Sequence, residues 1–156
     1  MKSKFALSLL CLGLFLFSCK KSANNIPAPL SQQEVISFKM NGNSALLDTT
    51  AAVVGQNTLQ VKGNGNSHYF AATDESLYIA VAGKVGTSVV GDNGVSASIN
   101  LMFPGLLDQY KATKGTITVT SISTKSVSGT FEFVAADGAG GTINVTDGQF
   151  TLNVSQ

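Results

Sequence analysis

From about residue 34 to its end, the chain alternates apolar and polar residues with a period of two. Phe131 and Phe133 flank Glu132, and residues 149–155 repeat the pattern. Alternation of this kind places one face of a β-strand against a core and the other face in water. No window of ten residues carries the 3.6-residue period of an amphipathic helix. The pattern therefore predicts an all-β domain.

Glycine-rich segments and one Pro-Gly pair divide this alternation into roughly eight to ten short antiparallel strands. Apart from two hairpins, strands are expected at roughly 50–54, 58–62, 67–72, 77–82, 86–90, 95–103, 115–122 and 126–134. Pro104 and Gly105 are expected to end one strand, and a loop through residues 106–114 to follow it. Many short strands with tight turns indicate a β-sandwich, with a small lipocalin-like barrel as the alternative.

Two Asx-Gly dipeptides predict hairpins whose register can be written out. Asn41-Gly42 and Asp147-Gly148 are each flanked by alternating residues and fit two-residue type I′ loops. The loops predict four apolar cross-strand pairs: Phe38 with Ala45, Ile36 with Leu47, Val145 with Phe150, and Ile143 with Leu152. In both hairpins the predicted pairs fall on one face, so turn chemistry and hydrophobic pattern agree.

The N-terminus has the order of a bacterial lipoprotein signal. Lys2 and Lys4 precede an uncharged apolar run at 5–17, which Ser18 and Cys19 follow. The run is 13 residues long, whereas a membrane-spanning helix needs about 20. The order resembles a lipobox and predicts cleavage between Ser18 and Cys19 with covalent lipid on Cys19. Ordinary secretion and an uncleaved anchor are the alternatives.

Three segments are therefore expected: a signal peptide at 1–18, the lipidated cysteine with a flexible tether at 19–33, and a single β domain at 34–156. Pro27 and Pro29 favour an extended tether. The mature chain has the size of one ordinary domain. Cys11 leaves with the signal and Cys19 takes lipid, so the domain has no disulfide.

The charges exclude a nucleic-acid partner. Two of the ten basic residues lie in the signal, which leaves eight lysines and no arginine against nine acidic residues. Nucleic-acid binding relies on clustered lysine and arginine that neutralise phosphates. A nearly neutral chain without such a cluster does not fit that class.

No catalytic or metal site is expected. His68 is the single histidine, and a zinc site needs three or four ligands. A G-x-S-x-G elbow is absent. Asp74 and Glu75 are adjacent and would point to opposite faces of a strand, which does not give a glycosidase pair. The loops at 91–94 and 136–138 offer oxygens for calcium but do not match an EF-hand loop, and turn chemistry explains them.

The tentative ligand contacts are His68, Tyr69 and Tyr110, because they lie near expected loops where an aromatic side chain can meet a partner. Phe70 and Phe103 are assigned to the core instead. No cofactor other than the lipid on Cys19 is expected.

Three segments together resemble a family of small envelope lipoproteins from Bacteroidetes-type bacteria. They are the Phe38-x-x-Asn41-Gly42 opening, the strand at 126–133 that contains Ser-Gly-Thr-Phe-Glu-Phe, and the closing segment at 147–150. The resemblance implies an envelope lipoprotein with a compact β fold, and it implies no activity.

The function expected from these observations is a lipid-anchored, non-enzymatic binding or structural module with a protein or glycan partner. A lipocalin-like carrier of a small apolar ligand is the alternative, and a carbohydrate-active hydrolase ranks third. Residues 20–24 contain no acidic surface-export signal. This favours the outer membrane with the domain facing the periplasm, and surface exposure remains an alternative.

Overall fold

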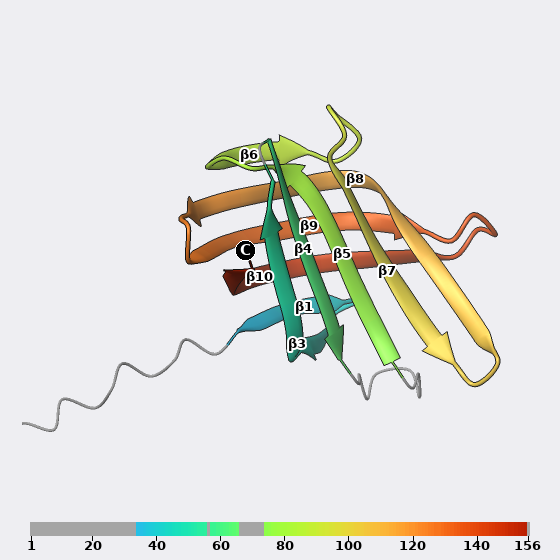
Figure 1. Ribbon diagram of the computed structural model, residues 1–156. Coiled ribbons are helices and arrows are strands. Elements are labelled where there is room, and N and C mark those ends of the chain that lie inside the picture. The colour runs from blue at the N-terminus through green and yellow to red at the C-terminus, as the bar shows by residue number, and fades with distance from the viewer. Residues whose placement is uncertain (1–33, 56, 66–73, 156) are drawn as a thin grey trace, which may run out of the picture.

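The computed structural model describes residues 34–55, 57–65 and 74–155, and these residues form strands and turns without a helix (Figure 1). The strands are β1 (Val35–Met40), β2 (Asn43–Leu47), β3 (Thr49–Val54), β4 (Thr58–Gly65), β5 (Asp74–Ala82), β6 (Gly86–Val89), β7 (Ser96–Phe103), β8 (Leu106–Ile122), β9 (Ser126–Ala136) and β10 (Thr142–Ser155). The predicted all-β class is confirmed. Within the described ranges, no helix has the length and apolarity to span a membrane.

The strands lie in two layers whose directions differ clearly (Figure 1). One layer contains β3, β4, β5 and β7, and the other contains β1, β9 and β10. The long strand β8 belongs to both, because residues 106–111 pair with β7 and residues 111–122 pair with β9. Its register shifts between Ala112 and Lys114, where it passes from one layer to the other. Strands that change layers at bulges are typical of sandwiches whose sheets cross steeply.

The hydrogen-bonded path also closes on itself. Val154 and Ser155 at the end of β10 pair in parallel with Ala52 and Val53 of β3. The path then runs through β4, β5, β7, β8 and β9 back to β10. The predicted sandwich therefore has the connectivity of a flattened barrel, so the two expected architectures describe one closed sheet.

The Asn41-Gly42 hairpin is confirmed. Its pairs are those predicted: Met40 with Asn43, Phe38 with Ala45, and Ile36 with Leu47. Both loop residues have positive φ, 50° and 87°, as a type I′ turn requires.

The second predicted hairpin, at Asp147-Gly148, is wrong. The chain does not reverse there, and β10 runs on as one strand in which Val145 pairs with Phe133 and Gly148 with Phe131. The additional residue forms a β-bulge, and Asp147 has a φ of 53°. A positive φ occurs in β-bulges as well as in type I′ turns. Pairing with β9 along one edge and β1 along the other favours the continuous strand.

The expected loop at 106–114 is also wrong, since β8 begins at Leu106 directly after the Pro104-Gly105 turn. Its first half carries polar residues on both faces, which hides the alternation. Phe103 is half-buried and packs against the core, as predicted. The expected strand at 67–72, with Phe70, lies outside the described residues.

An aromatic cluster occupies the core between the layers. The ring of Phe131 lies 6.0 Å from those of Phe38 and Phe133 and 6.5 Å from that of Phe150, measured between ring centroids. A Cβ atom at Gly148 would overlap the Phe131 ring, so glycine there makes room for the cluster. Burial of each ring contributes about 1.5–3 kcal/mol to stability.

Candidate functional site

Three hollows follow one another along β8 and β9. The first, of about 570 Å³, lies beside residues between 107 and 113 of β8 and the segment 136–139. The second, of about 260 Å³, lies beside 114–115, 132–134 and 144–146. The third, of about 370 Å³, lies beside Thr116, 130–132 and 147–149. From 136 to 130 along β9, the series covers about 20 Å at the rise of a β-strand.

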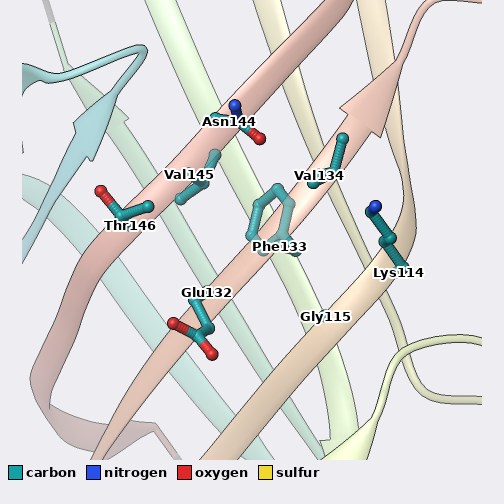
Figure 2. A pocket seen from close by; sticks show the side chains of 8 residues that line it. All are labelled: Lys114, Gly115, Glu132, Phe133, Val134, Asn144, Val145 and Thr146. Atoms are coloured by element: carbon teal, nitrogen blue, oxygen red, sulfur yellow. The ribbon is translucent and has the colours of Figure 1, made fainter.

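The central hollow lies where β8 has a glycine at its close approach to β9 (Figure 2). Gly115 has a φ of +144° and pairs with Phe133. A Cβ atom there would lie 2.5 Å from the Phe133 Cα and would overlap the carbonyl oxygen of Glu132. Glycine therefore lets β8 approach the β9 backbone closely, and the depression beside this contact is lined at its base by the buried Phe133 and Val145.

Four polar side chains surround this base. Lys114 on β8, Glu132 on β9, and Asn144 and Thr146 on β10 are exposed and line the hollow (Figure 2). None of these four side chains makes a hydrogen bond or ion pair with another residue of the described ranges. An ammonium group, a carboxylate, a carboxamide and a hydroxyl are therefore available to a ligand at one place.

The third hollow is more polar and contains an ion pair at its edge. Lys39 Nζ lies 2.8 Å from Asp147 Oδ2. The hydrogen bond to Asp147, and then the charge of this carboxylate, raise the pKa of Lys39. Thr116, Thr130 and Gln149 also line this hollow. Asp147 is thus held by the protein, whereas the two threonines and the glutamine present groups that a ligand can hydrogen-bond.

Tyr110, one of the residues predicted to contact a ligand, does not line the first hollow and packs against the core instead. Burial, and then the charges of Asp137 and Asp108, raise the pKa of Tyr110. The phenol therefore stays protonated at neutral pH. Asp137 accepts hydrogen bonds from the backbone N–H groups of Ala139, at 2.8 Å, and Gly141, at 2.9 Å. As the sequence predicted, turn chemistry explains the position of this aspartate.

The remaining predicted site residues lie outside the described residues: Ser18 and Cys19 of the lipobox, and His68 and Tyr69. Sequence reasoning placed Glu132 correctly on the solvent face of its strand but did not assign it to a site. It also missed Lys114, Asn144 and Thr146. The only available signal was their place on polar faces, which does not show that three strands bring them together.

The other layer carries a hollow of about 300 Å³ beside Asp74, Ser76 and Asn100. Here side chains bind one another, because Asn100 Nδ2 donates to Ser76 Oγ at 3.0 Å and Gln109 Nε2 donates to Asn100 Oδ1 at 3.1 Å. Glu75 is 1% exposed and faces the core, whereas Asp74 is exposed. The prediction that this acidic pair points to opposite faces is confirmed.

The predicted turn at 91–94 is explained by its backbone. Val95 N–H donates to the carbonyl of Asp92 at 2.8 Å, and Asn93 has a φ of 48°. In the part of the chain that the structure describes, no three His, Cys, Asp or Glu side chains come together in a way that could hold a metal ion.

No protein-family model matches this chain, and neither a curated protein nor a solved structure matches it significantly. What the protein does is therefore inferred from its own residues and geometry.

Proposed function

We propose that this protein is a lipid-anchored envelope lipoprotein whose β domain binds a neutral glycan chain along β8, β9 and β10, without catalysing a reaction. The observation that carries the binding proposal is the central hollow, where four polar side chains with no partner among the described residues surround an apolar base. Exposed side chains of both signs and several amides and hydroxyls continue along the neighbouring hollows.

The chemistry of these groups fits a sugar polymer. Hydroxyls of a glycan both donate and accept, so they can satisfy the Lys114 ammonium, the Glu132 carboxylate and the Asn144 amide together. The apolar C–H face of a sugar ring can cover the base formed by Phe133 and Val145. Lysine and acidic side chains lie in the same hollows, which disfavours a strongly charged polymer. The elongated arrangement fits a chain rather than a single small molecule.

The pairing of β9 disfavours an extended peptide. Peptides that bind sheets usually add a strand to a free edge through backbone hydrogen bonds. β9 pairs with β8 on one edge and with β10 on the other. The ligand therefore meets side chains here and has no free strand edge to pair with.

The carboxylates of the central and third hollows support a role without hydrolysis. Glycosidases use two carboxyl groups, one of them a general acid held in an apolar enclosure. Glu132 is exposed, and Asp147 is bound to Lys39. This arrangement supports binding of a glycan rather than its cleavage.

Membrane attachment is proposed through Cys19, in the outer membrane with the domain facing the periplasm. Two or more acyl chains give stable anchoring, since each buried methylene contributes about 0.8 kcal/mol. Metabolic labelling with palmitate should label the wild type and not Cys19→Ala, and globomycin should block maturation. Labelled lipid on Cys19→Ala would contradict the anchor. Membrane fractionation and protease treatment of whole cells would then locate the protein.

The binding proposal is tested with the mature protein and soluble neutral polysaccharides, such as β-glucan, xylan and mannan, by isothermal titration calorimetry. Lys114→Ala and Asn144→Ala should each weaken binding about 5-fold, since one hydrogen bond contributes about 1 kcal/mol. Lys125→Ala is the matched control, because Lys125 is exposed at the other end of β9. No binding of any polysaccharide, or equal losses in all three variants, would refute the proposal. Saturable uptake of a fluorescent fatty acid would support the carrier instead.

A further inference from the structure

The hairpin that joins β7 and β8 has an apolar, exposed tip. Leu106 is 57% exposed and Leu107 is 59% exposed, and they follow directly after the Pro104-Gly105 turn. No charged residue occurs between Val95 and Leu107. In contrast, three other exposed turns consist of polar residues and glycine, apart from one alanine. They lie at Asn41-Gly42, 123–125 and 137–141.

The two leucines lie on opposite faces of this hairpin. Leu107 pairs with Met102 on the outer face. Leu106 pairs with Phe103, which packs against the core. The tip therefore exposes Leu106 on one face and Leu107 with Met102 on the other, while Phe103 packs against the core. A protein surface would cover one face of such a tip, whereas a lipid phase surrounds both.

We propose that this tip inserts into the surface of a phospholipid bilayer. The depth of the apolar part of the hairpin fits insertion into the surface of a bilayer. Two residue pairs, Phe103 with Leu106 and Met102 with Leu107, precede the pair Leu101 and Asp108. The carboxylates of Asp108 and of Asp74, which pairs with Met102 from β5, mark the limit of the apolar part. Two pairs span about 7 Å, and interfacial segments bury their apolar side by about 5–10 Å.

The tether predicted from the sequence is long enough to allow this contact. Residues 20–33 are fourteen residues and extend to at most about 50 Å. A domain of this size is about 35 Å across, from a radius of gyration of about 14 Å. The tip can therefore reach the membrane even from the far side of the domain. This step rests on the proposed lipid anchor.

A single-tryptophan experiment tests the insertion directly, because the chain contains no tryptophan. Leu107→Trp is placed in the mature lipoprotein and bound to phosphatidylethanolamine–phosphatidylcholine vesicles that carry brominated acyl chains. Insertion should shift the emission to the blue and quench it at least 2-fold. Val85→Trp is the matched control: Val85 is 58% exposed and follows β5 at the end remote from the tip. Its emission should stay unchanged.

The outcomes separate insertion from anchoring. If Leu107→Trp floats with the vesicles but its fluorescence is not quenched, the insertion proposal is overturned and the anchor proposal stands. Protein that does not float contradicts the anchor. As a second measurement, Leu106→Asp combined with Leu107→Asp in the lipidated protein should raise protease cleavage of the vesicle-bound hairpin, and both sites tolerate polar residues because they are exposed. Equal cleavage rates would also overturn the proposal, as would a blue shift that requires an added protein.

Discussion

Alanine at Gly115 should destabilise the fold and distort the central hollow, and Gly86 provides a matched control. The two glycines have nearly the same φ, +144° and +142°. Alanine at either position is strained by about 1–3 kcal/mol, because L-residues rarely adopt this backbone conformation. The surroundings differ, since a Cβ atom at Gly86 meets nothing within 4 Å.

At Gly115 the new methyl group would contact backbone, which cannot rotate away. It would lie 2.5 Å from the Phe133 Cα, 2.6 Å from the Phe133 Cβ and against the carbonyl oxygen of Glu132. Relief would require β8 to move away from β9. Overpacking of this kind costs about 1–3 kcal/mol, so Gly115→Ala should be less stable than Gly86→Ala by that amount.

Urea unfolding followed by far-ultraviolet circular dichroism measures this difference. With a slope of about 1–3 kcal/mol per molar urea, the Gly115→Ala midpoint should fall about 1 M below that of Gly86→Ala. Polysaccharide binding should fall as well in Gly115→Ala alone. Equal midpoints would refute the steric role assigned to Gly115.

Three further outcomes are expected. Phe131→Ala should lower the unfolding free energy by about 3–5 kcal/mol, because this ring contacts three others; calorimetry showing less than 1 kcal/mol would contradict a packed core. Thr50→Val should stabilise by about 1 kcal/mol in urea unfolding, since the buried Thr50 hydroxyl has no hydrogen-bond partner among the described residues, and destabilisation would reveal one. Because the pKa of Tyr110 is raised in the folded state, the protonated phenol contributes stability below pH 10. This contribution should be lost as the pH rises through the folded-state pKa of Tyr110. Ultraviolet titration should show Tyr110 ionising at lower pH in Asp137→Asn; no change would contradict the charge effect.

The two Asx-Gly dipeptides that were predicted to form hairpins show what local sequence could and could not predict. Both have the positive φ that their composition favours, 50° at Asn41 and 53° at Asp147. Only the first reverses the chain. The second stays within a strand because β9 and β1 pair with the segments on both sides of it. The backbone conformation was predictable from two residues, whereas the topology depended on strands distant in sequence.

The hollows could not be predicted for the same reason. The polar face of β9 was visible in the alternation around Glu132. The central hollow depends on the shift between Ala112 and Lys114, which brings Gly115 opposite Phe133. A shift of one position reverses which side chains share a face. The site therefore depends on how strands distant in sequence pair with one another. The four residues that supply its polar groups do not form a recognisable sequence motif.

The hydrophobic tip and the row of hollows together orient the proposed ligand. Leu107 lies at the exposed tip and also lines the first hollow. From there the hollows proceed along β9 through Glu132 to Thr130, away from the tip. If the tip enters the bilayer, the first hollow lies at the membrane surface and the third lies farthest from it. A bound glycan that follows β9 would then be held at a fixed direction to the bilayer.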